Sequence, residues 1–187
     1  LEKVQGGPMA AEALFARAEV LAAQGAHVEA AELFATFAKQ HGDHARCPDA
    51  VLRRGEELRV AGRLEEAASC FVDLMKDKAL EAGLRAQARY GLAWIRYIQN
   101  DSASARALVL AVLQGKHQPL RDEAQYLLGL ASLKLDDPDA AEAAFRSVSG
   151  GRYEQDARRK YAWALLAAGK VEEALQAVEA YRKAFPK

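Results

Sequence analysis

The sequence predicts an all-α protein, a solenoid built from five helix–turn–helix pairs. Three observations lead to this prediction: a short residue pattern recurs five times, its turn residues are regularly spaced, and residues that favour β-strands are scarce. The chain has a single threonine, Thr36, so an all-helical interpretation has little competition.

The predicted turn between the two helices of each pair sets the period. Turn-forming residues occur at five places, separated by 37, 38, 36 and 33 residues: Gly25, Gly62, Asn100, Asp136 and Gly169. An amphipathic helix on either side of each turn, at this period, is typical of stacked helix pairs.

The recurring pattern is a small residue, a turn residue, an alanine and a large apolar residue. In chain order its copies span residues 18–34, 55–71, 91–112, 129–145 and 161–178, and the third is degenerate. The small residues fall in the middle of the first helices: Ala18, Gly55, Gly91, Gly129 and Ala162. The alanines fall on the second helices: Ala30, Ala67, Ala105, Ala141 and Ala174. The large residues follow four positions later: Phe34, Phe71, Val109, Phe145 and Val178. Glycine inside a helix costs ~1 kcal/mol relative to alanine, so we expect it to permit close approach of the partner helix at its alanine.

One helix start can be predicted in detail. Asp137 precedes Pro138 after the fourth turn. We expect Asp137 to cap the helix and Pro138 to occupy its first turn, where the missing N–H of proline is not needed.

This pattern resembles the tetratricopeptide repeat (TPR), and the resemblance covers the chain from about Ala11 to Pro186. The mid-helix small residue, the turn glycine, the alanine and the aromatic residue all match, and Pro186 closes the last unit. The sequence departs from the family where a first-helix tyrosine is usual, at Leu21, Leu58, Trp94, Ser132 and Leu165. Most units are also longer than usual, which is similar to TPR proteins of the bacterial envelope, such as the outer-membrane assembly lipoproteins and the Tol-Pal-associated coordinator.

The resemblance implies a right-handed α-solenoid of five TPR-like hairpins that forms one domain over residues 9–187. The repeats are expected at about 11–46, 47–83, 84–120, 121–153 and 154–187. Residues 1–8 resemble the tail of a unit, so we interpret them as the end of a preceding repeat or a linker.

Composition excludes several classes of protein. Basic and acidic residues number 26 each, which argues against a nucleic-acid binder or a protein that binds anionic membranes. No stretch approaches the ~18 consecutive apolar residues of a membrane helix. Cys47 and Cys70 are predicted to stay unpaired, and the sequence does not decide between a cytoplasmic and a periplasmic location.

Catalysis and metal binding are not predicted. The chain has no phosphate-binding glycine loop, no nucleophile elbow and no His-Glu-x-x-His helix, and no cofactor is expected. His41, His44 and Cys47, with Asp43 and Asp49 nearby, are zinc-ligand types. They fall in the loop between the first two units, so we interpret them as a solvated loop rather than a metal site.

A protein-binding groove is the favoured hypothesis. In TPR folds the first helices line the concave surface, so the resemblance implies that their non-core side faces a groove. On the third unit we expect a core stripe of Tyr90, Gly91, Trp94 and Ile98, with an arginine-rich stripe opposite. The predicted groove residues are Arg53, Arg59, Arg85, Arg89, Leu92, Arg96, Tyr126, Leu130, Lys134, Arg159 and Trp163. Arginines beside exposed aromatic and leucine side chains are typical of interface hot spots, and arginine suits carboxylate binding. The predicted partner is therefore an acidic, partly apolar segment of another protein.

Other interpretations remain open. Any single arginine can be a solvated charge, or can pair across units with Glu56, Glu123 or Asp156. The chain can also be a structural spacer that self-associates through its ends. RNA reading needs matched polar residues in successive units, which the chain lacks. The asparagines of the chaperone-tail carboxylate clamp are absent from the predicted groove, so a heat-shock-protein tail is not an expected ligand.

Overall fold

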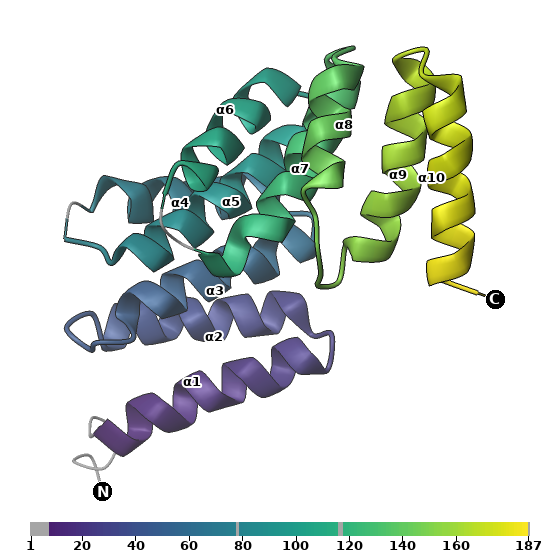
Figure 1. Ribbon diagram of the computed structural model, residues 1–187. Coiled ribbons are helices and arrows are strands. Elements are labelled where there is room, and N and C mark those ends of the chain that lie inside the picture. The colour runs from purple at the N-terminus through teal and green to yellow at the C-terminus, as the bar shows by residue number, and fades with distance from the viewer. Residues whose placement is uncertain (1–7, 78, 116–117, 187) are drawn as a thin grey trace, which may run out of the picture. The chain divides into compact units, whose positions relative to one another are not determined.

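Ten α-helices and one short 3-10 helix make up the computed structural model, which describes residues 8–77, 79–115 and 118–186 (Figure 1). The helices are α1 (Pro8–Ala23), α2 (His27–Gln40), α3 (Cys47–Val60), α4 (Leu64–Lys76), α5 (Ala82–Ile98), α6 (Ser102–Leu113), η2 (Gln118–Leu120), α7 (Arg121–Lys134), α8 (Pro138–Arg146), α9 (Glu154–Ala167) and α10 (Val171–Ala184). No strand occurs within the described ranges. The predicted all-α fold of helix–turn–helix pairs is confirmed.

Each of the five predicted turn residues adopts a left-handed backbone conformation. Their φ angles are 80° at Gly25, 80° at Gly62, 62° at Asn100, 56° at Asp136 and 76° at Gly169. Glycine adopts this conformation without strain, and asparagine and aspartate tolerate it better than other residues do. The first helix of every pair ends two residues before this turn residue, and the second helix begins two residues after it.

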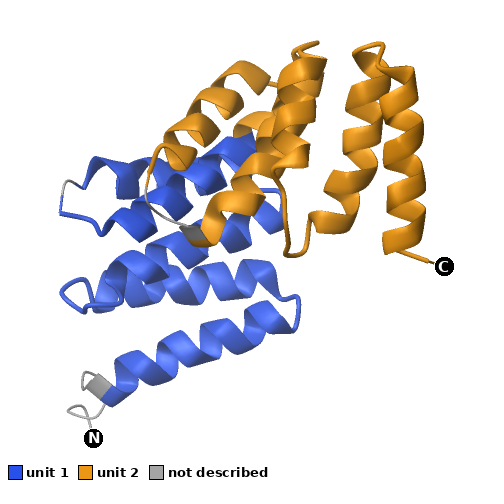
Figure 2. Cartoon of the chain, in the orientation of Figure 1, with its two compact units in different colours: residues 1–95 blue, residues 96–187 orange. Residues whose placement is uncertain are grey.

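The chain divides into two compact units, residues 1–95 and 96–187 (Figure 2). In the first unit α1 packs on α2, α2 on α3, and α3 on α4. The core at its start is aromatic: the Phe15 ring lies edge-on to Phe34, with centroids 5.1 Å apart, and to Phe37 at 5.3 Å. Buried alanines of α1, α2 and α3 fill the spaces around these rings.

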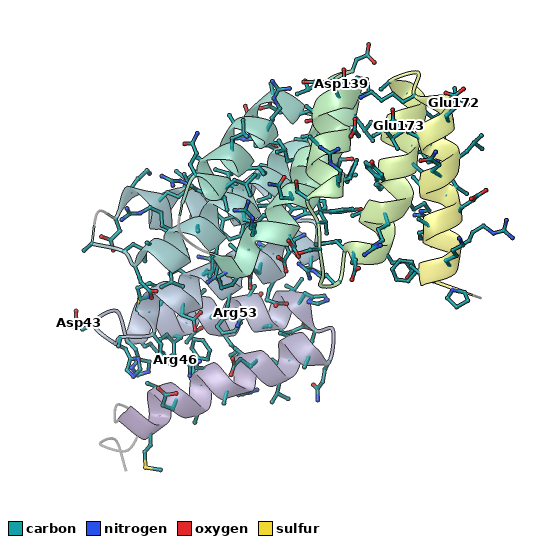
Figure 3. All side chains as sticks on the ribbon, viewed as in Figure 1. Asp43, Arg46, Arg53, Asp139, Glu172 and Glu173 are labelled. Atoms are coloured by element: carbon teal, nitrogen blue, oxygen red, sulfur yellow. The ribbon has the colours of Figure 1, made fainter. Side chains whose placement is uncertain are left out.

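The second unit repeats this packing, with α6 on α7, α7 on α8, α8 on α9 and α9 on α10. The predicted cap of α8 is confirmed, since Asp137 Oδ1 accepts a hydrogen bond from the Ala140 N–H at 3.1 Å and Pro138 opens the helix. Lys170 Nζ, just before α10, lies 2.7 Å from both Asp139 Oδ1 and Glu142 Oε2 of α8. Asp139 is labelled in Figure 3, at the N-terminal end of α8.

The expected tail of a preceding repeat falls outside this description. Residues 1–7 lie outside the described residues, and Pro8 is the first residue of α1.

Candidate functional site

The five hairpins can be aligned in a common register by numbering their residues from the turn residue, which is position 0 in each. Residues of the first helix then have negative positions and residues of the second helix have positive ones. At position −7 the chain has Ala18, Gly55, Ala93, Gly129 and Ala162, and all five are buried. The third copy of the sequence pattern was therefore predicted in the wrong register, because Gly91 lies at −9 and Ala93 takes the place assigned to it. The first-helix position assigned to Trp94 belongs to Arg96 for the same reason, at −4.

The helix glycines accommodate a phenylalanine ring. A Cβ at Gly55 would lie 2.7 Å from the Phe71 ring, a Cβ at Gly91 would lie 2.5 Å from the other edge of that ring, and a Cβ at Gly129 would lie 2.5 Å from Phe145. The expectation that these glycines let the partner helix approach at its alanine is therefore wrong, because the space at each glycine is occupied by an aromatic ring. Phe71 of α4 is thus held between α3 and α5.

The predicted faces of α5 are only partly correct: Tyr90 and Gly91 of the expected core stripe are buried, but its other two members are not. Ile98, predicted in the core stripe, is 45% exposed, and Trp94 is half-buried. Leu92, predicted to face the groove, is only 5% exposed, and Arg89 and Arg96 are half-buried. In the other hairpins position −4 is held mainly by core leucines such as Leu58 and Leu165, so Arg96 lies on the core side of its helix.

Arg85 supports a loop instead of facing a groove. Its Nη2 donates hydrogen bonds to the carbonyl oxygens of Asp77 at 2.8 Å and Leu80 at 3.1 Å. Both acceptors belong to the segment between α4 and α5. The guanidinium therefore satisfies backbone carbonyls that lie outside any helix.

Three other predicted groove cations bind partners within their own unit. Arg53 Nη1 lies 3.3 Å from Glu56 Oε2 on the same helix. Lys134 Nζ donates to Asn100 Oδ1 at 2.8 Å and lies 4.1 Å from the centre of the Tyr97 ring. Arg159 pairs with Asp156, also one helical turn away. Arg53 and Arg159 are thus paired with Glu56 and Asp156, but within one helix rather than across units as expected.

Tyr126 and Leu130, predicted as exposed groove residues, are buried. The Tyr126 ring stacks on Tyr153, with centroids 4.3 Å apart, and its hydroxyl donates to Asp156 Oδ2 at 2.5 Å. Burial and this hydrogen bond raise the pKa of Tyr126. Burial of Asp156 opposes its ionisation, but hydrogen bonds from Tyr126 and Arg159 outweigh that effect and lower the pKa of Asp156. Tyr126 is therefore a contact between α7 and the start of α9, which its sequence neighbours could not reveal.

Three predicted groove residues remain open to solvent without such constraints. Arg59 of α3 and Arg89 of α5 are half-buried, and neither has a hydrogen bond or ion pair to another described residue. Trp163 of α9 is 69% exposed. Both tryptophans of the chain, Trp94 and Trp163, lie at position −6 of their hairpins. The common register would have shown this repetition in the sequence.

The histidine-containing loop before α3 packs against aromatic rings. His41 and His44 contact the Phe37 ring, with centroids 5.3 and 5.4 Å apart, and Arg46 lies 3.5 Å from the centre of Phe15 (Figure 3). Among the described residues no group of three histidine, cysteine or acidic side chains could hold a metal ion. Cys47 and Cys70 are both free thiols, as predicted, and burial raises the pKa of each.

No helix of the described chain is both long and apolar enough to span a membrane.

Comparisons with known proteins identify similar repeats throughout the chain. The family model of the tetratricopeptide repeat matches residues 1–45, 52–119 and 126–187. MamA from Desulfovibrio magneticus RS-1 is a similar solved structure, with 16% identity, a TM-score of 0.75 and coverage of 95% of this chain and 96% of that one. A tetratricopeptide repeat protein from Parabacteroides merdae is 18% identical, with a TM-score of 0.73 and coverage of 95% and 67%. YrrB, described as a TPR protein with an unusual peptide-binding site, is 21% identical, with a TM-score of 0.68 and coverage of 83% and 76%. No curated protein sequence matches the chain.

Proposed function

Because the chain belongs to the tetratricopeptide repeat family, we propose that it is a non-enzymatic scaffold that binds a segment of another protein along its first helices. Members of this family are generally interaction modules rather than catalysts. The similarity of fold to YrrB, a TPR protein with a peptide-binding site, supports binding of a peptide segment.

One observation carries the location of the proposed site in the first unit. The α5 residues Gln87 and Trp94 are seven positions apart, so they share one side of the helix, and both retain exposure to solvent. A tryptophan that is partly open on a helix otherwise buried on most sides is the kind of anchor that dominates binding energy at interfaces. Trp94 is therefore the proposed anchor for an apolar side chain of the partner.

The proposed partner segment is also acidic. Arg59 lies at position −3 of α3, where its charge acts on Glu56 but its guanidinium makes no hydrogen bond to another described residue, so its N–H groups are available for a carboxylate. Arg89 and Arg96, seven residues apart, share a different side of α5 from Trp94. Arg59 thus replaces the Arg89 and Arg96 stripe as the proposed carboxylate-binding cation.

The test uses peptides selected from a random display library on the wild-type protein. We expect Trp94→Ala to weaken binding of the selected peptides strongly, and Arg59→Glu to weaken acidic ones in a salt-dependent way. Trp163→Ala is the matched control, because it removes the same side chain from the same hairpin position in the other unit. Circular dichroism establishes that each variant keeps its helix content.

The possible outcomes separate the candidate surfaces. Loss of binding in Arg89→Glu, Arg96→Glu but not in Trp94→Ala would restore the arginine stripe as the site. Undiminished binding in all of these variants would reject the first-helix surface altogether.

A second candidate function, a structural segment that associates through its ends, is favoured by a different observation. The outer face of α9 and α10 exposes five large apolar side chains: Trp163, Leu166, Val171, Leu175 and Val178.

A further inference from the structure

The outer face of the last hairpin contains a hollow of about 190 Å³ between α9 and α10. Its lining is almost entirely apolar and includes Trp163, Leu166, Leu175 and Val178. Leu175 is 63% exposed. The faces at junctions inside a solenoid are apolar, because a neighbouring hairpin stacks on them. This face therefore has the composition of an interior junction.

The preceding hairpin shows what such a face binds. The same register positions on α7 and α8 hold Leu130, Leu133, Pro138, Glu142 and Phe145. There α9 packs on α8 and also contacts α7. The hollow on α9 and α10 thus corresponds to the place where the first helix of a following hairpin lies.

The other end of the chain presents a matching helix. Position −12 of the first helices is alanine in every hairpin: Ala13, Ala50, Ala88, Ala124 and Ala157. The last four are completely buried, whereas Ala13 is exposed on α1. Met9 and Val20 are exposed on the same helix, Met9 to 87%. The outer side of α1 therefore has the small and apolar residues of a first helix that packs on a preceding hairpin.

Junctions inside the second unit pair position +6 of one hairpin with position +1 of the next. Between the third and fourth hairpins the residue at +6 is the cation, and Arg106 Nη1 lies 2.9 Å from Asp137 Oδ2. Between the fourth and fifth hairpins the residue at +6 is the anion, and Glu142 Oε2 lies 2.7 Å from Lys170 Nζ. At the free ends the corresponding residues are Leu175 at +6 and Ala26 at +1. Both are apolar, so neither end would leave a charge unpaired against the other.

Two further features match across the ends. The backbone of Ala26, with φ −80° and ψ 61°, is close to that of Lys170, with φ −88° and ψ 66°, so both place a side chain in the same way before a second helix. Tyr126 is at position −10 of its hairpin, and its hydroxyl donates a hydrogen bond to Asp156, which is at position −13 of the next hairpin. In the last and first hairpins of the sequence these positions hold Arg159, which pairs with Asp156, and Glu12, which pairs with Arg46; their charges are opposite.

We propose that a second copy of this chain docks the outer side of its α1 into the α9–α10 hollow, so that copies associate head to tail. This inference rests on the second candidate function, association through the ends, and names the two surfaces that meet; it does not depend on peptide binding along the first helices. The contact joins two different surfaces, so it is heterologous and produces open chains of copies, or a ring where the geometry closes.

The test exchanges the apolar pair for the ionic pair of the interior junction. Leu175→Glu introduces the residue type of Glu142, and Ala26→Lys introduces that of Lys170. Each single variant places a charge against an apolar contact, so we expect the association constant, measured by sedimentation velocity over a concentration series, to fall at least about tenfold. The double variant Ala26→Lys, Leu175→Glu should recover association, and so should an equimolar mixture of the two single variants.

Controls and opposing outcomes are specific to this arrangement. Leu110→Glu changes an exposed leucine of α6 that belongs to neither end, and it should leave association unchanged. A wild-type protein that remains monomeric over the concentration series would overturn the proposal and leave the hollow to a different protein. A dimer that Leu175→Glu disrupts and Ala26→Lys does not affect would also overturn it, because that result indicates two hollows facing each other.

Discussion

Replacing Gly91 with alanine should lower the free energy of unfolding, although alanine is the better helix former. An alanine Cβ at position 91 would lie 2.5 Å from Phe71 Cζ and 2.7 Å from Cε2. Carbon atoms in contact stay about 3.5–4.0 Å apart, so the ring or the helix must move by about 1 Å. Overpacking of this kind costs about 1–3 kcal/mol, whereas replacing glycine in a helix gains about 1 kcal/mol. We expect a net loss of up to about 2 kcal/mol.

The reasoning can be checked with a double-mutant cycle in urea. The three variants are Gly91→Ala, Phe71→Leu and their combination, with unfolding followed by circular dichroism. In the combination the new methyl group occupies space that the shortened side chain vacates, so the two losses should not add, with a coupling energy of about 0.5–3 kcal/mol. A Gly91→Ala variant that is more stable than the wild type, or losses that add fully, would show that the ring does not lie against Gly91.

Three further predictions concern single contacts, each measured by thermal unfolding. Tyr126→Phe removes the hydrogen bond to ionised Asp156 and should cost about 1.5–3 kcal/mol at neutral pH. Because the folded pKa of Asp156 lies below its ordinary value of about 3.9, this stabilisation is complete above that pH and is lost as the pH falls through the folded pKa. The difference between variant and wild type should therefore shrink in strong acid, and a constant difference would contradict the assignment. Asp137→Ala should cost about 1 kcal/mol through loss of the α8 cap, while Asp137→Asn, which can still cap, should cost less. Gly62→Ala should cost about 1–2 kcal/mol from backbone strain alone, since φ is 80° and a Cβ there would meet no atom within 4 Å; a neutral result would contradict the left-handed turn.

The helix pairs and their turns could be predicted because they depend on local chemistry. Residues that tolerate positive φ recur at the five turns, and the aspartate–proline pair before α8 specifies a helix start without any distant contact. In the third hairpin the turn at Asn100 and the second-helix residues are predicted correctly, but the first-helix positions are misassigned by two residues, because every helix glycine is assumed to have the same role. Gly91 admits a ring from the preceding hairpin, whereas Ala93 occupies the repeat position.

The candidate site was less predictable because burial of a side chain depends on the neighbouring hairpin. Tyr126 and Leu130 are typical surface anchors by residue type, yet both are buried in the folded chain. Lys134 is a residue type expected for a cation in a binding groove, but its Nζ donates a hydrogen bond to Asn100, 34 positions away in the sequence. Residue type identifies what can bind a partner, whereas packing across a junction decides what remains free to do so.

The ionic pairs between successive hairpins also constrain how the gene can gain or lose repeats. The common register and the alanine at position −12 would let hairpins recombine as equivalent modules. Excision of the fourth hairpin, however, would place Arg106 opposite Lys170, two like charges where Asp137 and Glu142 were the partners. Loss of the fifth hairpin would place no like charges together, although it would uncover Leu130 and Phe145 and leave Glu142 without Lys170. Shortening from the C-terminus is therefore the deletion that this order of charges accepts most readily.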